Sequence, residues 1–183
     1  MDATNQKIAN FLGFLEERTL HPIDTNVKIN ESCTATLLLI FVVIDSLSKI
    51  TCTNTEYIQF KEGRGNKVRF MNFLKNVMGH SCALFKDLLY GLRNDIVHTA
   101  INVKVVLSKD KDAPHLKEVN GSLWINTSQF LNDLKETVKE IHLDIADQGT
   151  YFQNAANRLQ ELNFIDVNED PMPSRAPNDV PFR

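Results

Sequence analysis

Apolar residues recur every three or four positions along most of the chain, which is the spacing of one face of an α-helix. Residues 4–20 follow this pattern, with charged residues on the opposite face. We expect an amphipathic helix there that ends at His21-Pro22, because the residue before a proline disfavours helical geometry. A second helix is predicted to begin after Asn30 or Ser32 and to run to about Ile50.

The second predicted helix holds the most apolar stretch of the sequence, residues 37–44, and is expected to lie in the core. Asn30 or Ser32 is its predicted N-cap, since both side chains accept hydrogen bonds from free backbone N–H groups. The eight apolar residues are closed by Asp45 and are too few to cross a bilayer. Residues 1–7 lack a basic region followed by an apolar core, so we expect neither a secretory signal nor a membrane partner.

The middle of the chain is predicted to contain a loop and two further helices. Residues 51–66 are polar and are predicted to form the loop. Helical patterning resumes at Val68, breaks at residues 79–81 and continues over residues 82–98. In the later helix, large apolar residues follow one another at spacings of four. We expect all of them to be buried: Leu84, Leu88, Leu92 and Ile96.

The pattern then changes from helical spacing to alternation, which is typical of strands. Residues 103–107 alternate, and two short segments, 116–119 and 122–125, flank Asn120-Gly121. An Asn-Gly pair between two such segments is a strong signal for a two-residue hairpin turn. We therefore expect a small β-hairpin inserted in a helical protein.

The final helix is predicted to begin at Thr127 or Ser128 and to continue after an interruption at residues 148–150. Residues 164–183 contain four prolines and several acids, and they cannot bury enough apolar surface to become ordered alone. We expect this tail to be disordered or held by a partner. The chain is therefore interpreted as one domain, residues 1–163, followed by the tail.

These elements predict an all-α fold, an antiparallel four- to five-helix bundle with a small inserted β-hairpin before the last helix. The length of 183 residues suits one such domain, and 43% hydrophobic with 23% charged residues is ordinary for a soluble protein. The three cysteines lie far apart without a CxxC pair, which indicates neither a disulfide framework nor a zinc site. We therefore expect a cytoplasmic location. A bundle by itself fixes no chemistry, so function has to be sought in a site.

Basic residues concentrate in one region, although the formal net charge of −3 gives no general reason to expect nucleic acid as a partner. Residues 61–98 contain seven basic and three acidic residues, a surplus of four that would attract an anionic ligand such as a phosphodiester. The alternative is a solvated charged face without a ligand. Four of the basic residues are the predicted RNA-binding set: Lys61, Arg64, Lys67 and Arg69.

Residues 93–95 (Arg-Asn-Asp) and His98 form a polar group at the end of an apolar helix. Charged side chains among large apolar residues are costly unless they are paired or used. Residues 92–98 resemble the Arg-x4–6-His motif of HEPN (higher eukaryotes and prokaryotes nucleotide-binding) domains, in which a polar residue follows the arginine. The order of the helices, with a β-ribbon before the final helix, also resembles that superfamily.

The resemblance implies a metal-independent endoribonuclease that uses no cofactor and forms a homodimer, so that two copies of the motif face one another across a cleft. It also implies RNA as the substrate and, for a toxin or host-defence effector, an inhibitory protein partner. The alternative is a HEPN-like module without catalysis that binds RNA, a nucleotide or a protein.

Each residue of the motif has a predicted role in cleavage at a phosphodiester. His98 would move protons, because histidine has a suitable unperturbed pKa near neutral pH. Arg93 would offer paired donors and a permanent charge to phosphoryl oxygens that gain negative charge in the transition state. Asn94, one turn before His98, would orient the imidazole or contact the phosphate. Asp95, as a partner of Arg93, and Tyr90 are the supporting residues.

Helix geometry leaves other interpretations open. Residues five apart on an ideal helix point about 140° away from one another. Arg93 and His98 therefore converge only if the helix distorts, if the arginine curls round or if the two come from different protomers. A purely structural role is the alternative, in which Arg93 pairs with Asp87 or Asp95. Asn94 and His98 would then share a hydrogen bond near the helix C-terminus.

A metal site is the weaker alternative. Asp95-x-x-His98 has the carboxylate-histidine spacing of di-iron bundles, which need a second copy on another helix. The other copy in this sequence, Asp112-x-x-His115, falls in a predicted turn beside a proline. We therefore expect no metal.

Overall fold

The computed structural model describes residues 3–29, 32–63, 65–98 and 104–161. Across these ranges the chain is mostly helical with one small sheet, broadly as predicted. The helical elements are α1 (Ala3–Leu15), η1 (Glu16–Leu20), α2 (His21–Ile29), α3 (Cys33–Thr51), α4 (Asn54–Lys61), α5 (Asn66–Asn76), α6 (His80–His98), α7 (Thr127–Ala146) and α8 (Thr150–Glu161). The strands are β1 (Val105–Ser108), β2 (Lys117–Val119) and β3 (Ser122–Asn126). The predicted tail, residues 164–183, lies outside the described residues.

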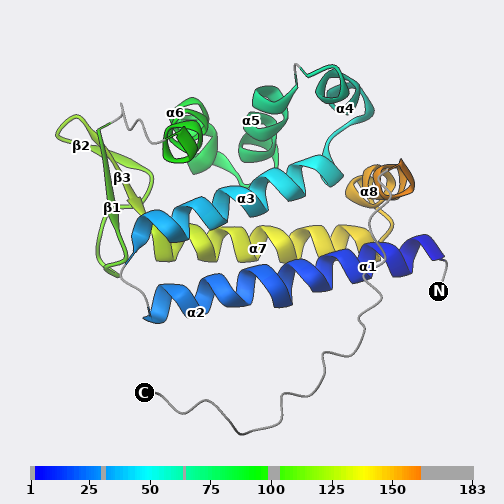
Figure 1. Cartoon of the computed structure of the whole chain (residues 1–183), viewed down its shortest axis with the longest axis horizontal. Helices are drawn as coiled ribbons and strands as arrows, with labels where there is room; N and C mark the ends of the chain where they lie inside the picture. The colour runs from blue at the N-terminus through cyan, green and yellow to red at the C-terminus, as the bar shows by residue number, and fades with distance from the viewer. Residues whose placement is uncertain (1–2, 30–31, 64, 99–103, 162–183) are drawn as a thin grey trace, which may run out of the picture.

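Helix α3 lies at the centre of the fold, as predicted for the most apolar stretch (Figure 1). It contacts α2, α5, α6, α7 and α8, and ten of its 19 residues are buried. Ser32 is its N-cap and accepts a hydrogen bond from the backbone N–H of Ala35 at 3.2 Å, which confirms one of the two predicted caps. In the described part of the chain, α3 is the one helix whose length and composition would allow it to cross a membrane.

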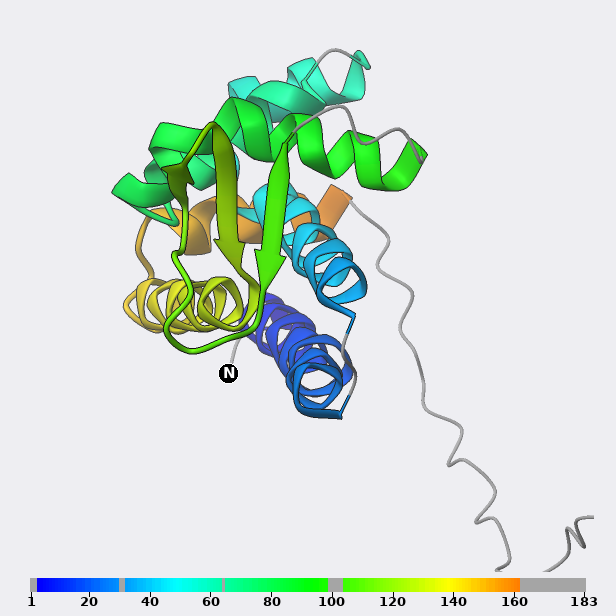
Figure 2. The same ribbon diagram turned by 90° about the vertical axis from the view of Figure 1, so that its left-hand side faces the viewer.

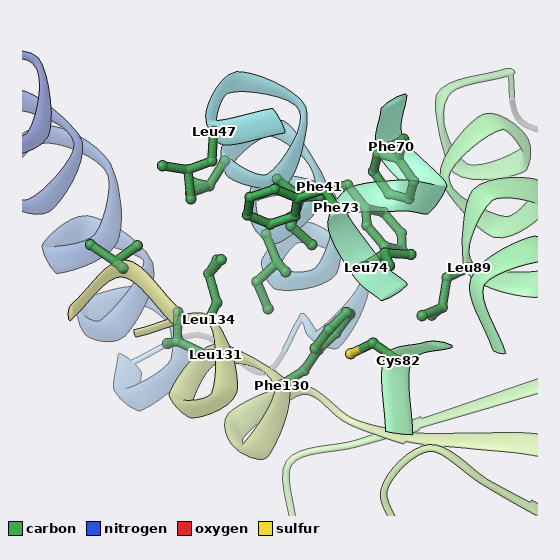
Figure 3. Packing of buried hydrophobic residues seen from close by; sticks show 14 of the residues in the cluster. Phe41, Leu47, Phe70, Phe73, Leu74, Cys82, Leu89, Phe130, Leu131 and Leu134 are labelled. Carbon is green, nitrogen blue, oxygen red and sulfur yellow. The ribbon is translucent and has the colours of Figure 1, made fainter. Parts of the chain in front are cut away.

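The core forms where α3 meets α5, α6 and α7, and aromatic rings fill it (Figure 3). The ring of Phe41 on α3 makes edge contacts with Phe70 of α5 and Phe130 of α7, at centroid distances of 5.9 and 6.2 Å. Cys82, near the start of α6, is buried in the same cluster. Burial raises the pKa of its thiol to about 12, so Cys82 stays protonated and acts as a small core residue.

The chain does not leave the helix at His21-Pro22, and that prediction is wrong. Helix α1 continues through the π-helical turn η1 directly into α2. Hydrogen bonds in a π-helical turn span five residues instead of four, which widens the helical path locally. Pro22 comes just after this turn, and the wider path lets the helix pass a proline ring that would clash with the preceding turn of a regular α-helix.

Part of the predicted loop over residues 51–66 is the short helix α4. A capping box starts this helix: the backbone N–H of Thr53 donates to Glu56 Oε2 at 2.8 Å, and that of Glu56 donates to Thr53 Oγ1 at 3.3 Å. The guanidinium of Arg158 on α8 lies 3.9 Å from the ring centre of Tyr57 and holds α4 in place. The capping box was readable in the sequence, whereas the contact from α8 was not.

The predicted hairpin is confirmed as β2 and β3, and β1 adds a third strand (Figure 2). Strands β2 and β3 pair antiparallel around Asn120-Gly121, whose φ angles of 51° and 72° suit a tight two-residue turn. Strand β1 pairs with β3 in parallel, so the order is β1-β3-β2. The sheet covers one end of the helices and leads through the N-cap Asn126 into α7, which begins at the predicted Thr127.

Helix α8 does not extend α7 but turns across its end, at the predicted interruption (Figures 1 and 2). Gln148 in this turn adopts a left-handed φ of 54°. The carboxylate of Asp144 then accepts hydrogen bonds from the first backbone N–H groups of α8, those of Thr150, Tyr151 and Phe152, at 3.1, 2.7 and 3.2 Å. This cap fixes α8 where it packs against α1, α3 and α7.

Gly149→Ala is expected to destabilise the turn between α7 and α8. A Cβ at position 149 would overlap the carboxylate of Asp144, which would have to leave the position in which it caps α8. The expected loss is that of a cap, about 0.5–2 kcal/mol in the free energy of unfolding, measured with urea. In an Asp144→Ala background, which has no cap to lose, the same substitution should cost clearly less. Equal costs in the two backgrounds would contradict this account.

Candidate functional site

Helix α6 carries the motif and turns a different face toward the core than predicted. Leu92 is buried and Ile96 packs against the core as expected, but Leu84 and Leu88 are 66% and 42% exposed. Residues four apart advance by about 400° around a helix, so a row at this spacing drifts by about 40° at each step. The start of the row therefore faces away from the core, and Leu89 faces the core instead.

Arg93 points from α6 toward α3 and forms an ion pair with Asp45. Its Nε and Nη2 donate to Asp45 Oδ2 at 3.0 and 2.6 Å. Both side chains are partly buried, so water screens the pair less than it would on the surface. Asp87, one of the two partners predicted for Arg93, lies 3.4 Å from Lys67 Nζ instead.

A second arginine, Arg69 on α5, contacts Asp45 from the buried side. Its Nη1 donates to the backbone oxygen of Asp45 at 2.7 Å and to Ser48 Oγ at 2.6 Å. Its Nη2 donates to Asn66 Oδ1 at 2.9 Å and lies 3.6 Å from Asp45 Oδ1. Burial lowers the pKa of this guanidinium, and the charge of Asp45 opposes that shift. The side chains of Arg69, Asp45 and Arg93 thus form one cluster across α5, α3 and α6, the Asp45 cluster.

Of the four residues predicted to bind RNA, the structure describes the side chains of two. Those of Lys61 and Arg64 lie outside the described part. Lys67 is more than half exposed, and its Nζ lies 5.9 Å from the ring centre of Tyr90, beside the motif. Arg69 is 2% exposed and cannot contact RNA, so this prediction is wrong. Helix α5 turns Arg69 toward α3, whereas Lys67 faces solvent.

Asn94 links Arg93 to the last turn of α6. Arg93 Nη1 donates to Asn94 Oδ1 at 2.8 Å, so the arginine side chain reaches the helix position of Asn94. Asn94 and His98 are four residues apart and therefore lie about 40° from one another around the helix. Because the Arg93 side chain curls round to Asn94, its guanidinium lies nearer to the position of His98 than the angle of about 140° between the two helix positions suggests. His98 is the last residue of α6, and its side chain lies outside the described part.

The two predicted supporting residues lie on the same helix. The ring of Tyr90 makes an edge contact with Phe70, with 5.7 Å between the ring centres, and so ties α6 to the core beside the motif. Asp95 is half-buried and follows Asn94 directly. Tyr90 therefore has a packing role that accounts for its position without any chemistry.

Asp45 is the site residue that sequence reasoning missed. It is the one charged residue between Cys33 and Lys49, in the most apolar helix of the chain. A carboxylate at such a position needs a partner, and that was the available signal. The partners could not be named from the pattern, because Arg69 and Arg93 lie 24 and 48 residues away in the sequence.

The contacts of Arg93 leave it able to bind a phosphate. A guanidinium has five N–H groups, and three of them are engaged with Asp45 and Asn94. The remaining two lie one on each terminal nitrogen, and the side chain is partly exposed. Two donors on one planar group match two oxygens of a phosphodiester.

His115, from the second Asp-x-x-His copy, has a structural position beside the sheet. Its Nδ1 accepts the backbone N–H of Asn126 at 3.2 Å, and its Nε2 lies 3.1 Å from Asp133 Oδ2. These contacts tie the segment before β2 to the start of α7. Within the ranges that the structure describes, no group of three His, Cys, Asp or Glu side chains is arranged to hold a metal ion.

Comparison of the chain with protein-family models, with curated proteins and with solved structures finds no match. Function therefore has to be argued from the geometry of the Asp45 cluster and of helix α6.

Arg69→Met is expected to lower the free energy of unfolding by about 3–5 kcal/mol, measured with urea. It removes the buried partner of Asp45 and the donor to Ser48 and Asn66. Lys67→Met is the control from the same helix, and because its side chain is more than half exposed we expect a change within about 0.5 kcal/mol. Equally small effects of the two substitutions would show that the buried arginine does not stabilise the fold.

Proposed function

We propose that the protein is a metal-independent endoribonuclease of HEPN type, with its helices in the antiparallel bundle of that superfamily. One observation carries the proposal. Asp45 holds the side chain of Arg93 in contact with Asn94, which lies one turn before His98. Two N–H groups of the Arg93 guanidinium are not used by Asp45 or Asn94. A fixed cation beside a polar amide suits a place where negative charge develops on phosphoryl oxygens.

The proposed reaction transfers a phosphoryl group within the RNA strand. His98 accepts the proton of a ribose 2′-hydroxyl, and the 2′-oxygen bonds to the adjacent phosphorus. The bond from phosphorus to the 5′-oxygen breaks, and that oxygen takes up a proton from water, while His98 returns its own proton to the solvent. Arg93 donates to the phosphoryl oxygens, which gain negative charge in the transition state. The products carry a 2′,3′-cyclic phosphate and a 5′-hydroxyl.

A homodimer through α6 is part of the proposal. Leu84 and Leu88 leave apolar surface exposed on this helix. Gly91 continues this surface, because apart from the adjoining backbone of α6 nothing described lies within 4 Å of the place where a Cβ would stand. By helix geometry, Leu84, Gly91 and His98 occupy positions within about 40° of one another around α6. Packing two copies on this strip would cover apolar surface and bring two motifs together.

RNA is the proposed substrate. Lys67 lies exposed beside the motif, where it would exchange its ion pair with Asp87 for an RNA phosphate. A role as a toxin or defence effector, held in check by an inhibitory protein partner, belongs to the same proposal. Such a partner would have to cover the motif end of α6.

Cleavage of a mixed RNA pool in excess chelator tests the proposed reaction. The native chain is expected to cut and to leave 2′,3′-cyclic phosphate ends. Arg93→Ala and His98→Ala should each lower the rate by about 100-fold or more, because each removes a group that acts in the transition state. His80→Ala removes an exposed histidine from the other end of α6, and it should cut as the native chain does.

Two results would overturn the ribonuclease proposal: a native chain that cuts nothing, or Arg93→Ala and His98→Ala variants that cut as well as the native chain. The alternative of a HEPN-like binding module would then be tested with the same variants, by their loss of affinity for RNA, a nucleotide or a protein.

Leu84→Glu is expected to convert a dimer into a monomer, measured by sedimentation velocity. The substitution puts a charge on the apolar strip of α6, where the partner helix would bury it. Leu143→Glu is the matched control, because Leu143 on α7 is exposed to the same extent, 66%, and lies off the strip. A native chain that sediments as a monomer, or a dimer that survives Leu84→Glu, would contradict the proposed interface.

A further inference from the structure

We infer that Asp45 is the positioning residue for Arg93, and that the buried Arg69 leaves the Asp45 cluster with a net positive charge for the phosphate. This inference rests on the proposed function and names a residue and a charge balance that the motif itself does not contain.

Asp45 is itself fixed in place by its contacts with the two arginines. Its carboxylate divides between two arginines, with Oδ2 bound to Arg93 and Oδ1 facing Arg69. Its backbone oxygen also accepts a hydrogen bond from Arg69, so Arg69 contacts both the side chain and the main chain of Asp45 from the buried side. Arg69 is fixed in turn by Ser48 and Asn66. Arg93 is therefore bound to a group with little freedom to move.

Asp45 also determines the direction in which the Arg93 side chain points. The contacts use the edge of the guanidinium that carries Nε and Nη2, which leaves Nη1 to donate to Asn94. A long arginine side chain in solvent samples many rotamers, and this ion pair selects one that reaches toward the last turn of α6. Pre-organisation of this kind lowers the cost of placing a cation at the reacting phosphate.

The net charge of the Asp45 cluster also favours a phosphate. An arginine paired with one carboxylate forms a neutral unit, which would attract a phosphate weakly. Here one carboxylate faces two guanidinium groups, so the cluster of Asp45, Arg69 and Arg93 carries a net charge of about +1. The buried arginine thus allows Asp45 to position Arg93 without cancelling the charge that binds RNA.

The test separates binding from cleavage. Asp45→Asn is expected to slow cleavage at saturating RNA by about 10- to 100-fold, since Arg93 loses its fixed position. The same variant should bind a 2′-O-methyl RNA, which cannot be cut, at least as tightly as the native chain, because the site gains positive charge. Asp24→Asn is the control: Asp24 is 27% exposed against 19% for Asp45, and it pairs with Lys135 at 2.7 Å away from the motif. It should change neither quantity.

A double variant isolates the charge balance. Asp45→Asn combined with Arg69→Met removes one charge of each sign and restores the net charge of the native cluster. We expect RNA binding to return to the native level while cleavage stays slow, with circular dichroism confirming that the variant is folded. Cleavage at the native rate by folded Asp45→Asn would overturn the positioning role. Weaker RNA binding by that variant would overturn the charge argument.

A measurement without RNA keeps the inference apart from the proposed function. In nitrogen-15 NMR spectra, the signal of the Arg93 Nε–H is identified as the one that is absent from the Arg93→Lys variant. In the native chain this N–H should be protected from exchange with solvent. The signal should lose its protection in Asp45→Asn and keep it in Asp24→Asn. If this holds while the native chain cuts no RNA, the proposed function fails and the positioning contact stands. An Arg93 Nε–H that exchanges freely in the native chain would overturn the inference.

Discussion

A carboxylate shared by two arginines determines how the motif helix is held. Asp45 stands in the most apolar helix of the chain, where an unpaired charge would be too costly to keep. Arg69 satisfies it from the buried side and Arg93 from the partly exposed side, so the two contacts tie α5 and α6 to α3. The rotation of α6 about its own axis follows from this connection, and so do the positions of Asn94 and His98.

The apolar core and the Asp45 cluster act on the same three helices. Phe41 and Phe70 join α3 to α5 through an edge contact, and Tyr90 extends this ring contact to α6. The motif therefore sits on a rigid element that is fixed by packing on one side and by an ion pair on the other. Leu84 turns outward as a consequence, which leaves on α6 the apolar strip that the proposed dimer needs.

Features that depend on neighbours in the sequence were predictable. The cap at Ser32 and the hairpin turn follow from local hydrogen bonds and φ preferences, and both were confirmed. Arg93 was singled out from local polarity, but the sequence did not give its partner. The inward turn of Arg69, the outward turn of Leu84 and the role of Asp45 depend on contacts between helices far apart in the chain, and no local pattern contains them.

In the proposed reaction, Arg93, held by Asp45, receives the phosphate of an RNA strand. A crystal structure of the protein with a short 2′-O-methyl RNA, which cannot attack its own phosphorus, tests this most directly. We predict a phosphodiester within hydrogen-bond distance of Nη1 and Nη2 of Arg93, beside Asn94 and the imidazole of His98, with the contact to Asp45 intact. An RNA phosphate bound away from Arg93, or an Arg93 that leaves Asp45 to reach it, would contradict the account.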